Sequence, residues 1–281
     1  MHTFLLNGDL NLRLILAASC SILIATLVGV LDDLNVKAVK KKDKDIMEYR
    51  VGLPQWLKPL LTLPAAIPLM VVKAGVSYMT FPFIGRVDLG LIYPLILVPI
   101  AFICVSNTNN MLAGMNGLEA GLGFLSSFAI GIYTLMLGRY EASIISLALA
   151  GALLGFLKWN WYPAKVLPGD SLTYLIGATY VSAVIIGNIE LFGILVYIPW
   201  IIEAFLKLRG RFAVSSLGIL QADGTLKSRY DKIYSLTHLA MRIGKFKEWQ
   251  ITLILMCFEL LIILLAFYAA FLFGPIRTLS S

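Results

Sequence analysis

Residues 106–121 combine four asparagines and three glycines between two long apolar runs. A helix surrounded by lipid has no routine use for these residue types. Amides and glycines at membrane depth are tolerated where the backbone and the side chains line a polar cavity. We therefore interpret this segment as a candidate site, with an ordinary polar turn as the alternative.

Charged side chains lie at the ends of other apolar runs. Asp32 and Asp33 end one run, Lys58 opens the next, and Asp170 opens a later one. Adjacent aspartates repel each other, so either one of them keeps its proton or both share a cation. An oxygen-rich site with few carboxylates is typical of Mg2+, which completes its shell with water and phosphate oxygens. The alternative is that each aspartate only caps or ends a helix.

The composition predicts the elements that must position these groups. Hydrophobic residues make up 59% of the 281 residues, more than in soluble domains. Apolar runs of roughly 17 to 25 residues predict membrane-spanning helices. Eight such runs lie near residues 14–31, 57–72, 91–106, 117–137, 141–157, 171–187, 190–206 and 250–273. The expected fold is an all-α polytopic membrane protein with one domain over residues 1–281.

Basic residues predict the orientation of these helices. The segments 32–58, 158–170 and 207–248 hold seven, two and nine of the 23 Lys and Arg residues. Lys and Arg next to membrane helices remain in the cytoplasm, so these segments, together with 107–117, are predicted to be cytoplasmic loops. The net charge of +7 is then mainly a topology signal, and nucleic acid is not an expected partner.

Short β-hairpins are expected in two loops. Residues 77–90 resemble an extracytoplasmic hairpin, and Asp223-Gly224 suits a tight turn within residues 221–226 on the cytoplasmic side. The lysine-rich run 40–44 is interpreted as a solvated loop that faces lipid headgroups.

Three motifs carry a resemblance to a known family. They are Asp32-Asp33 at the end of a span, NTNNMLAGMNGLEAG over residues 107–121, and NWYPAKVLPGD over residues 160–170. In order and spacing, the chain resembles the polyprenyl-phosphate N-acetylhexosamine-1-phosphate transferases. Within them it is most similar to the archaeal and eukaryotic branch that uses UDP-N-acetylglucosamine and dolichyl phosphate. Bacterial relatives that load muramyl-pentapeptide have Asp-Gly pairs in the second motif and a late histidine cluster, and this chain has neither.

The resemblance implies a reaction and a cofactor. A polyprenyl phosphate oxygen would displace UMP from UDP-N-acetylglucosamine at the cytoplasmic face, in the first step of lipid-linked oligosaccharide assembly for N-glycosylation. Mg2+, or Mn2+ in its place, would be held by Asn110 and Asp170. Lys58 would meet phosphate, and Asp32 and Asp33 would position the acceptor phosphate or the lysine.

The resemblance also implies substrate contacts, at Asn107, Asn116, Glu119, Arg209 and Arg211. Asn116 would face the uridine. The triplet Arg209-Gly210-Arg211 is similar to a basic, histidine-containing triplet of the family, with glycine in place of the histidine. Both guanidiniums suit bidentate phosphate binding, with anchoring of the cytoplasmic loop as the alternative.

The position of the aspartate pair predicts a shortened chain. Family members have ten membrane helices with the pair after the third, whereas here the pair follows the first predicted span. Two helices are therefore expected to be missing before residue 1, because the sequence is a fragment, has a misplaced start codon or is a naturally short form.

The sequence also leads to expectations about alternative functions, cellular location and partners. A transporter with polar breaks and a degenerate, non-catalytic homologue stay as alternatives. The expected location is an archaeal cell membrane, or the endoplasmic reticulum membrane in a eukaryote. The expected partners are a UDP-N-acetylhexosamine, polyprenyl or dolichyl phosphate and the lipid bilayer, with a homodimer as the alternative to a monomer. His238 and Glu259 receive no role.

Overall fold

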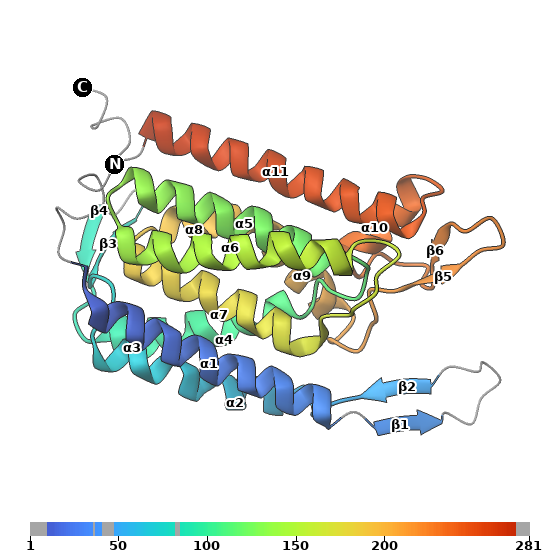
Figure 1. The fold of residues 1–281 in the computed structure, drawn as a ribbon, viewed down its shortest axis with the longest axis horizontal. Coiled ribbons are helices and arrows are strands. Elements are labelled where there is room, and N and C mark those ends of the chain that lie inside the picture. Colours follow the sequence, from blue (N-terminus) through green and yellow to red (C-terminus); the bar gives the residue numbers. More distant parts are fainter. Residues whose placement is uncertain (1–9, 36, 41–47, 82–84, 274–281) are drawn as a thin grey trace.

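A computed structural model describes residues 10–35, 37–40, 48–81 and 85–273 as a helical bundle with short hairpins at its two ends (Figure 1). The helices are α1 (Leu12–Leu34), α2 (Leu57–Thr62), α3 (Ile67–Val71), α4 (Val98–Asn109), α5 (Leu118–Met136), α6 (Tyr140–Asn160), α7 (Gly169–Gly187), α8 (Glu190–Val196), α9 (Ile198–Arg209), α10 (Leu236–Ile243) and α11 (Glu248–Phe273). The strands are β1 (Lys37–Lys40), β2 (Glu48–Val51), β3 (Tyr78–Phe81), β4 (Gly85–Asp88), β5 (Gly218–Leu220) and β6 (Leu226–Ser228).

The membrane-protein prediction agrees with these helices, although the number of spans differs from the expected eight. Among the described residues, five helices are long and apolar enough to cross a membrane: α1, α5, α6, α7 and α11. The pair α8 and α9, bent by 62°, makes a sixth if it is counted as one span. The apolar helices over Leu57–Val71 and Tyr93–Asn109 are shorter. Eight full crossings and two missing N-terminal helices stay predictions.

Prolines explain where the shorter helices change their geometry. A 3-10 turn over Leu63–Ala66 separates α2 from α3, and each of the two later pieces has a proline in its first turn, Pro64 and Pro68. The missing N–H of proline removes a helical hydrogen bond. Pro199 has the same effect at the start of α9, where the chain bends after Tyr197.

Helix α7 is the common partner of α1 and α4 at the centre of the bundle. A side chain at Gly29 of α1 would place its Cβ 2.6 Å from the Cα of Ser171, in the first turn of α7. A Cβ at Gly177 of α7 would lie 2.8 Å from the Cα of Ser106 in α4. Such separations require glycine, so the backbones of the three helices touch directly. On the other side of α7, α5 packs against α6 and α11.

The hairpins confirm two loop predictions and add one. Strands β3 and β4 pair antiparallel, from Tyr78 with Asp88 to Phe81 with Gly85. Strands β5 and β6 pair around the predicted turn, with Gly224 at φ 79°. Strands β1 and β2 also form a hairpin, which was not predicted, and most of the lysine-rich run lies outside the described residues. Figure 1 shows β1–β2 and β5–β6 at one end of the bundle and β3–β4 at the other.

Candidate active site

Four side chains from four helix ends meet at the end of the bundle that carries β1–β2. The ammonium Nζ of Lys58, in α2, lies 2.5 Å from Oδ2 of Asp32 in α1 and 2.9 Å from Oδ2 of Asp170 in α7. The amide of Asn110, just after α4, donates Nδ2–H to the same Oδ2 of Asp170 at 2.6 Å. The structure therefore brings together four of the residues that the sequence selected.

Most of the charge in this cluster is buried. The side chains of Asp32 and Lys58 are 5% and 10% exposed, whereas that of Asp170 is 27% exposed. Asp32 also accepts the backbone N–H of Leu53 through Oδ1. Because buried charges are costly unless paired, each carboxylate depends on the single lysine between them. Asp170 is the carboxylate that a ligand can reach more easily.

Asp33 has a different position from its neighbour. Its Oδ1 accepts the backbone N–H of Asp170 at 2.8 Å, and its Oδ2 accepts that of Ser171 at 3.0 Å. Both oxygens thus bind the N-terminus of α7, where a negative charge is favoured by the helix dipole. Gly169 permits this approach, because it has φ 67° and its Cβ would lie 2.6 Å from Oδ2 of Asp33. Asp33 fixes the turn that presents Asp170.

This contact predicts a graded effect of replacing Asp33. Asp33→Asn keeps one acceptor oxygen but loses the charge and the second acceptor, a change of roughly 0.5–2 kcal/mol for a helix cap. We expect a loss of turnover of about tenfold, through displacement of Asp170, with the pH–rate profile unchanged in shape. Initial rates across pH test this expectation. Loss of one limb of the profile would instead show that Asp33 itself exchanges a proton in the reaction.

A polar cleft of about 570 Å3 opens beside the cluster. Its lining includes Lys58, Asn107, Asn110, Tyr174 and Arg211. The Asn107 amide donates to Thr62 Oγ1 at 3.2 Å and accepts the hydroxyl hydrogen of Tyr174 at 3.2 Å, so its position is fixed on both sides. Arg211, two residues after the end of α9, has φ 52°, a left-handed conformation that turns the chain sharply at this point.

Lys207 lines the same cleft, and the sequence reading did not select it. Its buried ammonium donates to Val214 O at 2.8 Å and to Ser216 Oγ at 2.6 Å, and lies 3.6 Å from Glu203 Oε1. Ser216 Oγ in turn donates to Met111 O at 3.1 Å. Lys207 therefore attaches the loop after α9 to the segment that carries Asn110. The i,i+4 spacing of Glu203 and Lys207 in an apolar helix was a usable signal.

Three predicted substrate-binding residues lie outside the lining of the cleft. Asn116 donates its backbone N–H to Glu248 at 2.7 Å, and Thr252 donates to its carbonyl at 3.1 Å. Glu119 is buried and accepts the N–H of Gly114 at 2.6 Å, while its Oε2 has no partner among the described residues. Arg209 is exposed at the end of α9.

His238 is fully buried in α10, next to the loop that follows α9. Burial, with the charges of Lys207 and Arg242 as smaller causes, lowers its pKa from 6.5 to about 4. Nδ1 accepts the backbone N–H of Tyr234 at 3.4 Å. The imidazole is therefore neutral at neutral pH, and it packs in the interior outside the lining of the cleft.

This pKa predicts how stability depends on pH. The unfolded chain binds a proton at His238 below pH 6.5 and the folded protein only near pH 4, so stability is full above pH 6.5 and falls between these values. We expect a loss of up to roughly 3 kcal/mol at about 1.36 kcal/mol per pKa unit. His238→Asn, which keeps an acceptor at the Nδ1 position, should flatten this difference in thermal unfolding between pH 7 and pH 4. Equal pH dependence in both proteins would contradict it.

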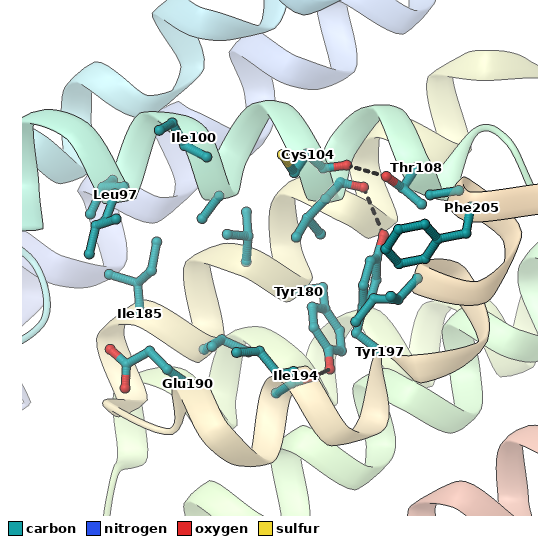
Figure 2. A pocket seen from close by; sticks show the side chains of 18 of the residues that line it. Leu97, Ile100, Cys104, Thr108, Tyr180, Ile185, Glu190, Ile194, Tyr197 and Phe205 are labelled. Carbon is teal, nitrogen blue, oxygen red and sulfur yellow. Dashed lines mark hydrogen bonds between the residues drawn. The ribbon is translucent and has the colours of Figure 1, made fainter. Parts of the chain in front are cut away.

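An apolar groove of about 540 Å3 adjoins the polar cleft, because Phe212 lines both. It follows α4 and is bounded by α7 and the bent pair α8–α9 (Figure 2). The phenols in its wall are satisfied internally: Tyr180 donates to Gly193 O at 2.7 Å and Tyr197 to Val105 O at 2.8 Å. The groove thus offers an apolar surface that continues from a charged cleft.

The donor set at Asp170 and Asn110 fits a magnesium ion. No group of three or more His, Cys, Asp or Glu side chains suited to a metal occurs among the described residues. Mg2+ does not need such a cage, because one or two protein oxygens plus water and phosphate oxygens satisfy it. The partly exposed carboxylate of Asp170 suits that role, and Asn110, which contacts it through Nδ2 and lines the cleft, could add its amide oxygen.

Comparison with known proteins gives the family. The model of glycosyl transferase family 4 matches residues 15–188. A protein of Sulfolobus acidocaldarius, named as a candidate UDP-N-acetylglucosamine–dolichyl-phosphate N-acetylglucosaminephosphotransferase, is 38% identical over 76% of this chain and 66% of its own length. A Saccharolobus solfataricus protein of the same name is 35% identical over 94% and 77%. A phospho-N-acetylmuramoyl-pentapeptide-transferase of Clostridium perfringens is 32% identical over 63% and 53%. The chain belongs to glycosyl transferase family 4.

Proposed function

We propose that this protein transfers N-acetylglucosamine 1-phosphate from UDP-N-acetylglucosamine to a polyprenyl phosphate of the dolichyl type and releases UMP. This would be the first step of lipid-linked oligosaccharide assembly for N-glycosylation. The observation that carries the proposal is the position of Lys58 between Asp32 and Asp170, in a cleft that continues into an apolar groove. A charged cleft suits the diphosphate, and the groove suits an isoprenoid chain.

The names of the two archaeal relatives support this donor and this acceptor. The second motif has Ala113-Gly114 and Asn116-Gly117 where bacterial muramyl-pentapeptide transferases have Asp-Gly pairs, and His238 does not belong to a histidine cluster. These differences favour N-acetylglucosamine over the peptidoglycan precursor.

The reaction joins two anions. An oxygen of the acceptor phosphate forms a bond to the sugar-bearing phosphorus, and the bond from that phosphorus to the oxygen bridging the diphosphate breaks, so that UMP leaves with that oxygen. A phosphate monoester is largely ionised near neutral pH, since its second pKa is about 6, so the acceptor needs no strong base. The protein's task is therefore to neutralise charge and to align the two phosphates.

Individual side chains divide this task by position. Lys58 supplies a buried ammonium at the cleft, and Asp32 orients it through the contact between Nζ and Oδ2. Arg211 adds a guanidinium that can bind phosphate through two parallel hydrogen bonds. Asp33 holds the first turn of α7 so that Asp170 faces the cleft edge.

Asp170 and Asn110 would hold Mg2+, with Mn2+ as the alternative ion. When bound, the ion would withdraw charge from the diphosphate oxygens.

The membrane setting follows from the same features. Five apolar helices support an integral membrane protein. The loops richest in Lys and Arg adjoin the helix ends that carry the charged cluster, so we assign this end of the bundle to the cytoplasmic face. Gly151 and Gly155 of α6 have open space around them, so a second copy could approach closely, and the homodimer stays a prediction.

A transfer assay tests the proposal against its alternatives. The full chain in lipid vesicles, given labelled UDP-N-acetylglucosamine and dolichyl phosphate, should yield one UMP for each labelled lipid diphosphate. A transporter would accumulate label inside vesicles without a lipid product, and a degenerate homologue would do neither. UDP-N-acetylmuramoyl-pentapeptide with undecaprenyl phosphate is the matched substrate control. Product from this pair alone would overturn the donor assignment.

A further inference from the structure

We propose that Glu190 and Tyr93 form a polar end to the apolar groove and thereby limit how much of the isoprenoid chain the protein recognises. The inference rests on the proposed function, because it treats the groove as the site of the acceptor chain. It adds a determinant of acceptor specificity far from the charged cleft.

The pair lies at the end of the groove opposite the cleft. Glu190, the first residue of α8, points its carboxylate to the same end of the groove as Leu97 and Ile185, while Thr108 and Phe205 mark the end toward the cleft (Figure 2). Tyr93 is 4% exposed and donates its hydroxyl hydrogen to Glu190 Oε1 at 2.6 Å.

The phenol is held in place from behind. A Cβ at Gly75 would lie 2.5 Å from the hydroxyl oxygen of Tyr93, so this glycine leaves room for the ring. Gly75 also has φ 82°, which disfavours a side chain there. The pair is thus a defined contact rather than an isolated charged residue.

A carboxyl group changes what an apolar chain gains by binding. Along the rest of the groove, burying isoprenoid surface is worth roughly 25 cal/mol per Å2. The Thr108 hydroxyl does not interrupt this surface, because it donates to Cys104 O at 2.6 Å. Covering the half-buried carboxyl of Glu190 would instead cut it off from water, a cost of about 1–3 kcal/mol for a polar group. The chain therefore leaves the groove for the bilayer before this pair.

The length of the groove sets the number of isoprene units that it can hold. Leu97 and Thr108 are eleven residues apart along a helical segment, which corresponds to about 16 Å. An isoprene unit adds four chain bonds of about 1.5 Å each, or roughly 4–5 Å when extended. The groove then accepts about three to four units, starting from the phosphate.

The test is a series of acceptors of increasing length. For the full-length protein, kcat/KM should rise from geranyl to farnesyl and geranylgeranyl phosphate and change by less than about twofold from there to undecaprenyl phosphate. In the double variant Glu190→Leu/Tyr93→Phe, which replaces both polar partners by apolar groups of similar shape, the rise should continue several-fold beyond geranylgeranyl phosphate. Glu190→Gln keeps an acceptor for the Tyr93 hydroxyl and should keep the plateau at the wild-type length. A steady rise beyond four units in the wild type, or a wild-type plateau in the double variant, would overturn the inference.

Cys104 gives a readout that does not depend on turnover. Both thiols are exposed, but Cys104 lines the groove and Cys20 of α1 does not, so Cys20 serves as the reference in the same sample. Protection of Cys104 from alkylation by isoprenoid phosphates, without any donor, should reach its maximum at about four units. Protection with this plateau but no transfer would reject the proposed function and retain the polar end. Transfer together with protection that grows steadily with chain length would retain the proposed function and reject the polar end. The wild-type acceptor series tests the inference even if a variant misfolds.

Discussion

Lys58→Met is expected to reduce transfer by about 10²–10³-fold or more, because it removes the cation that would face the reacting phosphates in the proposed reaction. The same ammonium separates the carboxylates of Asp32 and Asp170, at 2.5 Å and 2.9 Å. Removing one partner of a buried ion pair also costs roughly 3–5 kcal/mol of stability. Lys58→Arg should recover part of the rate, since the charge survives while its geometry changes. Initial rates with varied polyprenyl phosphate measure both effects.

Two further variants separate catalysis from folding. The double variant Lys58→Met/Asp32→Asn removes the unpaired buried charge and should regain stability in thermal unfolding while remaining inactive. Lys227→Met, at an exposed position of β6, is the matched lysine control and should keep the wild-type rate. Near-normal transfer by Lys58→Met would show that this lysine has no part in the chemistry.

Asp170→Asn and Asn110→Ala are each expected to abolish Mg2+-dependent transfer. The first keeps the size of the side chain but removes its charge, and the second removes the amide oxygen that would bind the ion. The Lys58–Asp32 contact remains in both variants, so the helices should stay together. A loss of more than 10³-fold at saturating Mg2+ is the expected rate effect, in line with interactions that act mainly in the transition state.

Binding of the ion can be followed without turnover. Mg2+ added with UDP-N-acetylglucosamine should raise the melting temperature of the wild type and of Asp223→Asn, an exposed control in the β5–β6 turn, but not that of either site variant. A wild-type thermal response to Mg2+ in Asp170→Asn would remove this carboxylate from the metal site.

The sequence predicted which charged residues cluster, but not the contact of Asp33 that holds Asp170 in place. Asp32, Lys58, Asn110 and Asp170 each lie at the end of an apolar run, and the predicted topology puts all four of these ends on one side of the membrane. The neighbouring Asp33 could not be separated from Asp32 by spacing. Its contact with the N-terminus of α7 depends on how closely α1 and α7 approach, which no local pattern encodes.

Other differences have physical causes of the same kind. The spans near 57–72 and 91–106 were counted by hydropathy, yet Pro64 and Pro68 divide the first into short helical pieces. Lys207 was counted as an orientation signal, because only the fold shows that Val214 and Ser216 surround its ammonium. In the β1–β2 hairpin, β1 (KAVK) lacks the alternating pattern that predicts strands, and the alternation in β2 (EYRV) covers only four residues.

The backbone contacts at Gly29 and Gly177 have a consequence for mutational tolerance. They set the spacing of α1, α7 and α4, and these helices carry the aspartate pair, Asp170 and the asparagines of the cleft. Leucines on the outer face of α1, such as Leu23 and Leu27, are exposed and can be exchanged for other lipid-soluble residues. One methyl group at Gly29 would instead push α1 away from the first turn of α7. The residues least open to substitution in this protein thus include two that have no side chain, because the separation of the charges depends on them.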